Sequence, residues 1–320
     1  MQRKLEFWII TSTEDIASMN IRSQLLEDYS FIQVSDKSDE WVTWENHPTF
    51  LLETPKFAHV NIRLVLTDTA MVLLGDSIPK DKISRFIGAD FAIFASRHKS
   101  KSAMPALLCH STGNWSEETS FGGDPKTLCR TSARLVRLAF QNLVTQKQKF
   151  GLDWPVDLEV NHHGPTQLSF PLIFMELGSA EDNWNHNIGG KAVANAIMNT
   201  ILSYLHEAPL NFSELSLNFS REELYSYIKQ HESKVCIGIG GVHYARNFST
   251  LLDRISISFI IPKFFVQGLT EDLLDQMISN TLEPIECAII DWSSLNSADR
   301  LVLIKLLENK SIPWKKRKAV

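Results

Sequence analysis

Val156-Asp157-Leu158-Glu159-Val160-Asn161-His162-His163-Gly164-Pro165 is the stretch that carries the strongest signal for both fold and site in this 320-residue chain. Residues 156–160 form an apolar, strand-like run, and a Gly-Pro pair breaks the chain directly after two histidines. The pattern places His162 and His163 where a buried strand ends and the chain turns. Sites in α/β proteins are usually built at strand ends, so this pair is the first candidate functional group.

Three more histidines follow strand-like runs in the same way. They stand in the segments Ser96-Arg97-His98, Leu107-Leu108-Cys109-His110 and Gly240-Gly241-Val242-His243-Tyr244. A single histidine at a strand end is usually a satisfied polar group, but four such places in one chain predict a shared polar centre. Because neutral imidazole is the commonest metal ligand in proteins, we interpret the set as a metal site.

A hydrolytic zinc site typically adds a carboxylate and leaves one position for water. The candidate carboxylates are Glu159, Glu176 and Glu181. Glu176 is the one at a strand end, so it is the preferred ligand or base. The sequence contains no HExxH, HxxEH or CxxC motif, and the ligands must therefore come from separate segments.

Strand-like runs alternate with helical patterns along most of the chain. The expected strands are residues 5–11, 31–34, 50–53, 60–66, 71–74, 91–95, 106–110, 156–160, 172–177, 235–239, 256–261 and 287–290. The expected helices are residues 15–26, a helix started by Asp124 and Pro125, one from Gly189 to Leu205, one capped by Ser220 and Glu223, and residues 271–278 and 298–308. This order predicts an α/β fold with three α/β/α layers and a mixed sheet.

The chain is expected to form a single domain over residues 1–312, followed by a basic, frayed tail at residues 313–320. The polar segment 35–48 is expected to be a mobile loop. Neither an internal repeat nor a low-complexity linker divides the sequence.

Composition excludes several classes of protein. The net charge of −5 argues against a generally basic nucleic-acid binder, so a nucleic-acid surface must be a local patch. The 4 cysteines stand in apolar contexts and indicate reduced, buried thiols of a cytosolic protein. No run is long enough for a membrane span, and the first apolar run is too short for a signal peptide, so a cytoplasmic location is expected.

The glycine run at residues 238–243 resembles a dinucleotide motif only superficially. It fails because His243 occupies the place of the third glycine and no helix clearly follows. The glycines either aim His243 and Tyr244 into a site or form only a tight turn.

A second glycine-containing loop, residues 111–123, ends in Gly122 and Gly123 and precedes three arginines. Arg130, Arg134 and Arg137 recur at spacings typical of one helix face. A helix start beside such a stripe favours phosphate binding, although a solvated helix face produces the same pattern.

Several short segments along residues 1–250 together resemble the metal-dependent, archaeal- and plant-type D-aminoacyl-tRNA deacylases. The matching segments, in the family's order, are residues 17–21, 96–98, 110–114, 121–123, 159–165, 174–179 with Glu181 and Trp184, and 238–245, with a weaker match at Ile290-Asp291. The chain departs from the family pattern at Asn161, where Thr is usual, and at Leu108-Cys109, where Thr-Val is usual. Residues 35–48 match nothing in the family.

The resemblance implies a phosphorylase/hydrolase-like α/β domain, similar to peptidyl-tRNA hydrolases, with two zinc ions per subunit. It implies hydrolysis of the ester between a D-amino acid and the terminal ribose of tRNA, which is a step of translation quality control. In plant-type members it also implies activity on aldehyde-modified D-aminoacyl-tRNA.

The residue patterns and the family resemblance together suggest roles for individual residues. The expected metal ligands are His98, His110, His162, His163, Glu176 and His243. The expected catalytic residues are His98, His163 and Glu176, and the sequence does not separate ligand from base. The expected substrate-binding residues are Arg97, Gly122, Gly123, Arg130, Arg134 and Tyr244, with Arg97 or a second metal at the oxyanion.

The expected partner is the acceptor end of D-aminoacyl-tRNA, which proteins read by stacking and phosphate contact. Neither DNA nor a membrane is an expected partner, and the protein is expected to be a monomer. Two alternatives remain open. A zinc peptidase or amidohydrolase on a related fold would share the histidines but not need the arginine stripe, and a non-catalytic RNA-binding module would hold no metal.

Overall fold

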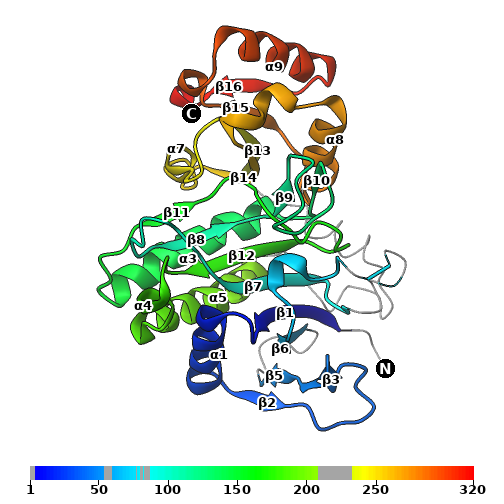
Figure 1. Cartoon of the computed structure of the whole chain (residues 1–320), viewed down its shortest axis with the longest axis vertical. Helices are drawn as coiled ribbons and strands as arrows, with labels where there is room; N and C mark the ends of the chain where they lie inside the picture. The colour runs from blue at the N-terminus through cyan, green and yellow to red at the C-terminus, as the bar shows by residue number, and fades with distance from the viewer. Residues whose placement is uncertain (1–3, 54–59, 77, 80–81, 83–86, 208–232) are drawn as a thin grey trace.

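The computed structural model describes residues 4–53, 60–76, 78–79, 82, 87–207 and 233–320. Its main feature is an 8-stranded sheet in the order β11-β8-β12-β7-β1-β6-β5-β2 (Figure 1). In that order the strands are Val156–Leu158, Leu107–His110, Leu172–Leu177, Phe91–Arg97, Leu5–Ser12, Val60–Thr67, Phe50–Leu52 and Phe31–Gln33. The pairs β8–β12, β5–β6 and β2–β5 are antiparallel and the others parallel, which confirms the predicted α/β class with a mixed sheet.

A second sheet of 4 strands, all parallel, occupies the upper part of Figure 1. Its order is β14 (Ile255–Ile261), β13 (Lys234–Ile239), β15 (Cys287–Ile290) and β16 (Trp314–Lys316). Because β16 lies in the basic tail, the prediction that this tail frays is wrong. Trp314 stacks on Trp292 with ring centroids 5.8 Å apart, which helps to hold the tail on the sheet. The domain boundary at residue 312 stays a prediction.

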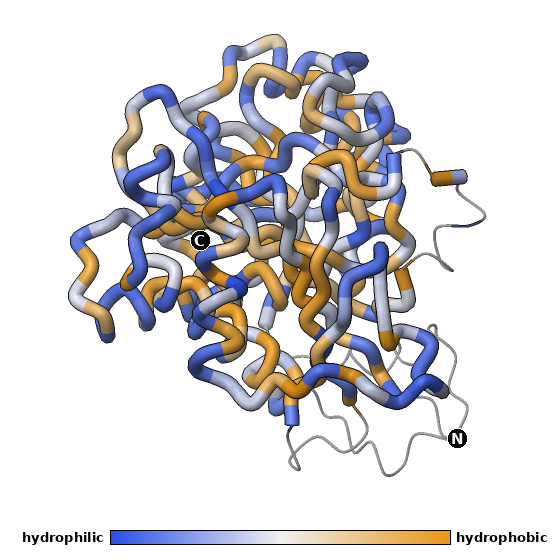
Figure 2. Tube along the Cα trace, turned by 60° about the horizontal axis from the view of Figure 1, so that its bottom comes forward, coloured by the Kyte–Doolittle hydropathy of each residue, from blue (hydrophilic) through white to orange (hydrophobic). Residues whose placement is uncertain are grey.

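Three helices cover one face of the large sheet. They are α1 (Ile16–Asp28), α3 (Ala133–Lys149) and α5 (Asn187–Glu207). Along β1, Phe7 and Ile9 point into the core beneath these helices, whereas Trp8 and Ile10 belong to a second core on the opposite face. Figure 2 shows the hydrophobic positions concentrated along the middle of the molecule.

The remaining helices lie outside this layer. They are α4 (Glu181–Trp184), α7 (Arg246–Ser249), α8 (Glu271–Ser279) and α9 (Ser297–Asn309), with short 3-10 helices at η3 (Lys263–Gly268), η4 (Trp292–Ser294) and η5 (Arg317–Ala319). Apart from the differences described below, the predicted strands and helices within the described residues are present with small shifts at their ends.

Within the described residues, a hairpin and turns pack on the second face of the large sheet. The hairpin consists of β3 (Thr43–Trp44) and β4 (His47–Pro48). Trp44 is buried against Trp8, with ring centroids 5.6 Å apart. The segment predicted to be a mobile loop is therefore anchored by a tryptophan in the second core.

The run 71–74 also packs on this face, but not as the predicted strand. Met71–Leu73 is a 3-10 helix, η2. Met71 and Leu74 are the two buried residues of the run, and their spacing of three matches a 3-10 turn rather than the alternation of a strand.

Helix α3 begins at Ala133, not after Asp124 and Pro125 as the sequence predicts. Thr127–Leu128 instead forms β10, which pairs with β9 (Gly113–Asn114). Residues just after Pro125 form a turn and this short ladder. The helix therefore begins only after the ladder ends.

The true start of α3 is capped from two sides. The hydroxyl of Ser132 accepts a hydrogen bond from the amide of Leu135 at 3.1 Å. The buried carboxylate of Glu283 accepts from the amides of Ala133 and Arg134 at 2.9 and 3.3 Å, and from the Ser132 hydroxyl. A residue 151 positions away thereby completes the cap.

We expect Glu283→Ala to lower the free energy of unfolding by about 2–4 kcal/mol, because two buried amides and a hydroxyl lose their acceptor. Urea unfolding followed by circular dichroism measures the change. Glu308→Ala, at an exposed carboxylate of α9, is the matched control and should stay within about 0.5 kcal/mol of the parent. An equally small effect of Glu283→Ala would contradict the capping role.

Three further expectations concern the chain as a whole. Cys109, Cys129, Cys236 and Cys287 are free and buried, which agrees with the prediction that they form no disulfide frame. Among the described residues, no helix combines the length and apolar character needed to cross a membrane. The predicted capping box of Ser220 and Glu223 lies outside the described residues.

Candidate metal centre

Histidines and glutamates from five segments meet beside the ends of β7, β8 and β11. The cluster consists of His98, His110, His162, His163, His243, Glu159 and Glu176. All four histidine-bearing segments that the sequence singles out therefore come together in space. His243 comes from the loop after β13, in the second sheet.

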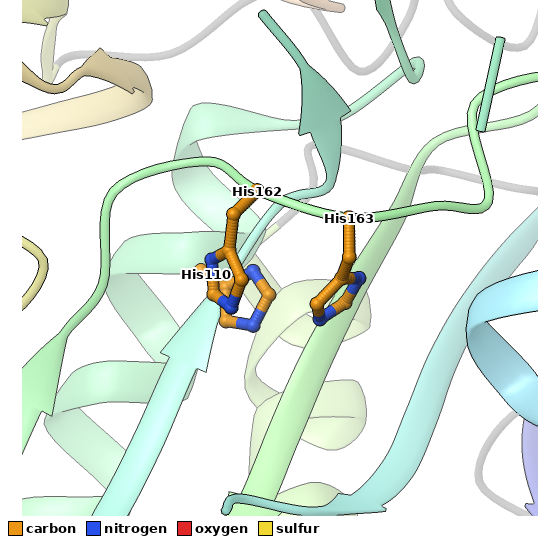
Figure 3. A group of neighbouring side chains, drawn as sticks. All are labelled: His110, His162 and His163. Carbon is orange, nitrogen blue, oxygen red and sulfur yellow. The ribbon is translucent and has the colours of Figure 1, made fainter. Parts of the chain in front are cut away.

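The cluster contains three groups of ligand atoms, each group lying within 4.8 Å. They are His110 with His162 and His163, Glu159 with His162 and His243, and His98 with Glu159 and Glu176. Figure 3 shows the first group, with one ring at the end of β8 and two from the loop that follows β11.

Glu176 links the two strand ends. Its strand, β12, runs parallel to β7 but antiparallel to β8, so the ends of β7 and β8 point in opposite directions. The Oε2 atom of Glu176 lies 3.4 Å from Nδ1 of His98, and its Oε1 lies 3.6 Å from Nε2 of His110. One carboxylate thus spans the space between two histidines that the sheet alone would separate.

Glu159 is the central carboxylate of the cluster. Its side chain is 0% exposed, and neither oxygen has a hydrogen-bond partner among the described residues. Oε1 lies 2.8 Å from Nε2 of His243 and 3.5 Å from Nδ1 of His98, and Oε2 lies 3.8 Å from Nε2 of His110. A buried carboxylate is stabilised by a cation beside it, which either a metal ion or a protonated histidine supplies.

The sequence marks Glu159 only as one candidate among three, and Glu176 as the preferred one. The signal that identifies it is a charged residue inside a buried strand-like run directly before the two histidines. Glu181, the third candidate, is exposed at the start of α4 and lies outside the cluster.

Backbone carbonyls set the tautomers of His110, His162 and His163. In each ring Nδ1 lies within hydrogen-bond distance of a carbonyl oxygen, which can only accept. The carbonyls belong to Ser111, Val160 and Gly164, at 3.1, 2.8 and 2.6 Å respectively. Nδ1 therefore carries the hydrogen, and Nε2 of each ring keeps a lone pair for a metal ion.

Charges within the cluster divide the histidines into two kinds. Burial opposes the protonation of His98 and His110, but the two carboxylates outweigh it and raise the pKa of both. Burial first, and neighbouring histidines second, lower the pKa of His162 well below its ordinary value and that of His163 to about 4. Burial also favours a higher pKa for Glu176, but the contacts with His110 and His98 lower it instead.

Tyr244 orients His98. Its hydroxyl lies 2.9 Å from Nε2 of His98, while Nδ1 of the same ring faces the carboxylates. Glu159 and Tyr244 also pair through the backbone, so the tyrosine is fixed relative to the cluster. Its predicted role as a substrate-binding residue stays a prediction.

We expect Tyr244→Phe to lower kcat/KM or metal affinity by about 10- to 100-fold, because His98 loses the partner that orients its ring. Steady-state kinetics and metal titration on the same preparation measure both quantities. Retention of the parent values in both would show that Tyr244 does not position His98.

Two pockets meet at the histidines. The first, of about 320 Å³, has an aromatic lining of Trp115, Phe121, Phe264 and Phe265. The second, of about 570 Å³, has a charged lining of Glu14, Asp15, Arg97, Lys99 and Glu176. His162, His163 and His243 line both, so the centre opens to an aromatic side and a charged side.

Arg97 reaches the charged pocket from the end of β7. Its guanidinium lies 5.5 Å from the ring centroid of Trp184 and donates to the carbonyl oxygen of Glu14 at 3.1 Å. These contacts hold an exposed cation at the pocket. Its binding of substrate stays a prediction.

Gly122 and Gly123 shape the loop that borders the aromatic pocket. Gly122 has φ +74°, and a Cβ atom there would lie 1.9 Å from the carbonyl oxygen of Val72. The amides of the two glycines donate to the carbonyl of Thr119 at 2.9 Å and to the carboxylate of Asp76 at 3.2 Å. Both amides are thus already paired within the chain, and the predicted role of Gly122 and Gly123 in substrate binding stays a prediction.

The predicted stripe of Arg130, Arg134 and Arg137 is not formed. Arg130 precedes α3, and Arg134 is 3% exposed with its guanidinium 5.0 Å from the ring centroid of Tyr204. Neither Arg130 nor Arg134 lines the two pockets beside the histidines. The spacing misleads because the helix begins later than the sequence suggests.

Fold and site together define an α/β protein whose buried imidazoles and carboxylates could hold metal ions beside pockets of ligand size. The sequence model of the family described as D-aminoacyl-tRNA deacylase matches residues 86–315. The chain belongs to this family. It is accordingly a hydrolase, a D-aminoacyl-tRNA deacylase, and the resemblance seen in the sequence is confirmed.

Individual relatives agree with this assignment. The D-aminoacyl-tRNA deacylase of Methanocaldococcus jannaschii is 32% identical over 236 residues, covering 71% of this chain and 82% of that protein. That of Methanosarcina acetivorans is 30% identical over 304 residues, covering 94% of this chain and 88% of that protein. A crystal structure of a conserved protein of unknown function shares the fold, with a TM-score of 0.76 at 23% identity over 100% of this chain and 98% of that one.

Proposed function

We propose that the protein hydrolyses the ester bond of D-aminoacyl-tRNA with a zinc-activated water molecule, releasing the D-amino acid and free tRNA. The observation that carries this proposal is Glu159, whose two buried oxygens face histidine nitrogens and have no hydrogen-bond partner among the described residues. A cation at this place would balance the carboxylate. The family supplies the substrate class.

The donor set of the cluster fits zinc. Imidazole nitrogen and carboxylate oxygen are usual zinc ligands, and catalytic sites use three of them with one position left open. When bound, zinc lowers the pKa of a water molecule and polarises a carbonyl group. We assign one ion to His110, His162 and His163. We assign a second to Glu159 with His98, Glu176 and His243.

The protein's own residues then position the reacting groups. Glu176, whose pKa is lowered by its histidine contacts, stays ionised and holds His98 and His110 in place. His98 would face the second ion with Nδ1, the atom nearest to Glu159 and Glu176, while the hydroxyl of Tyr244 at Nε2 keeps its ring oriented. Arg97, at the charged pocket, can stabilise the negative charge that develops on the carbonyl oxygen of the ester when water attacks.

We further propose that residues 1–312 act as one catalytic domain and that the protein works as a monomer in the cytoplasm. Free, buried cysteines are typical of a reducing compartment, which supports this location. Only the acceptor end of the tRNA needs to reach the histidines, since they lie between two pockets of modest size.

Chelation tests the metal-dependent part of this proposal. Dialysis against a chelator should abolish hydrolysis of D-Tyr-tRNA, and added Zn²⁺ should restore it in step with the metal content measured by elemental analysis. Full activity of metal-free protein would contradict the proposal. Binding of tRNA without metal or turnover would favour the RNA-binding module, and cleavage of peptides instead of charged tRNA would favour the peptidase.

A further inference from the structure

Three exposed aromatic rings gather beside the metal centre. Among the large apolar side chains of the described residues, the exposed aromatic ones are Phe121 at 71%, Phe264 at 72% and Phe265 at 38%. All three line the same pocket. Exposed apolar side chains are usually scattered singly, so their shared position indicates a ligand with an apolar face.

Two loops present these rings. Phe121 belongs to the loop between β9 and β10, and its carbonyl oxygen accepts a hydrogen bond from the amide of Gly164 at 3.0 Å. Phe264 and Phe265 belong to η3, which follows β14 of the second sheet. The same loop that carries the paired histidines therefore also fixes one side of the aromatic pocket.

The pocket shares a wall with the metal centre. His162, His163 and His243 line it, and its volume of about 320 Å³ lies in the range of small-molecule sites. Trp115 closes the wall, with its indole nitrogen donating to the carbonyl oxygen of Asn161 at 2.8 Å. A group bound here lies directly next to whatever is held by the histidines.

An ester held at the histidines has two arms of different chemistry. The acid arm carries an ammonium group, which suits the charged pocket with Glu14 and Asp15. The alcohol arm carries the ribose, a base and the phosphate chain. A base offers a flat π face to an aromatic ring, and aromatic side chains are the usual platform for unpaired bases.

We propose that the aromatic pocket binds the terminal base of the tRNA 3′ end by stacking on Phe264 and Phe121. Lys263 lies with its Nζ 5.0 Å from the ring centroid of Phe264, which places a cation beside the phosphate next to that base. The inference rests on the proposed function, since it takes the ester to lie at the histidines. Stacking uses the π face that every base has, so the pocket does not depend on the sequence of the tRNA.

A double-mutant cycle between protein and substrate tests this inference. One substrate is D-Tyr-tRNA, and the other is the same molecule with hydrogen in place of the terminal base. Phe264→Ala should raise KM for the normal substrate by roughly 5- to 150-fold with kcat unchanged. Removal of the base should cost the parent protein at least the same factor, because the contact with Phe121 is lost as well, and Phe264→Ala should add nothing on the abasic substrate.

Three controls accompany the cycle. Phe264→Tyr keeps a ring and should recover most of the affinity that Phe264→Ala loses. Leu301→Ala removes an exposed apolar side chain of α9, outside the aromatic pocket, and should also leave KM unchanged. Binding of uncharged tRNA and of its abasic form is measured in parallel, because it reports on the pocket without catalysis.

The outcomes distinguish this inference from the proposed function. If Phe264→Ala raises KM or weakens binding equally with and without the base, the pocket does not hold the base. The same conclusion follows if the effect changes with the amino acid carried. If the parent protein binds tRNA in a base-dependent way but hydrolyses no D-Tyr-tRNA, the base pocket stands and the proposed function fails.

Discussion

Glu159→Gln is expected to lower kcat/KM for D-aminoacyl-tRNA by about 10³-fold or more. The amide keeps the shape of the side chain but removes the negative charge, and one oxygen, that face His98, His110 and His243. Two of the three ligand groups contain this carboxylate, so the bound metal should fall together with the activity. Kinetics and elemental analysis of the same preparation measure both.

Glu181→Gln is the matched control, because Glu181 is an exposed carboxylate at the start of α4. It should keep the parent activity and metal content. If Glu159→Gln also kept both, Glu159 would not be part of a metal centre, and its burial would need another explanation.

His110→Asn is expected to lower kcat/KM by about 10²-fold or more, because the first ligand group loses one of its three nitrogens. The side-chain amide of Asn can still donate to the carbonyl of Ser111, as Nδ1 of His110 does, but nothing replaces Nε2. The metal content should fall by about half if each of the two assigned ions is bound independently. Elemental analysis and steady-state kinetics check the two effects.

His206→Asn serves as the control for this substitution, since His206 is an exposed residue near the end of α5. Thermal unfolding in the presence of chelator separates loss of metal from loss of fold. Unchanged metal content with a lowered melting temperature would assign His110 a structural role only.

Sequence patterns predicted much of this centre because they are local. His98, His110 and the His162-His163 pair each stand at the end of a buried strand, which neighbouring residues reveal. The ends of β7 and β8 point in opposite directions, and Glu176 of the strand between them joins the two. The spacing of hydrophobic residues along neighbouring positions likewise predicts most strands and the main helices, and these elements are present in the structure.

Features that depend on distant partners were beyond such patterns. The start of α3 depends on Glu283, which caps it from 151 positions away, so Asp124 and Pro125 presented a better local signal than Ser132. The late helix start leaves Arg130 outside the helix, and Arg134 in the first turn packs against Tyr204 of α5 instead of facing solvent. Local spacing describes a helix face only when the helix ends are known.

Glu159 illustrates the same limit at the site itself. Its position in a short strand-like run does not show whether its side chain faces solvent or a cluster of imidazoles. The environment of the side chain depends on how β8, β11 and β13 are arranged in space. Because its buried oxygens have no hydrogen-bond partner among the described residues and face histidine nitrogens, its position favours a cation beside it.

Deacylation of D-Tyr-tRNA and of L-Tyr-tRNA by one preparation, with and without chelator, tests the central claim most directly. We predict rapid hydrolysis of the D-aminoacyl ester alone, abolished by the chelator and restored by Zn²⁺. Equal turnover of both esters, or turnover that the chelator leaves unchanged, would contradict the account.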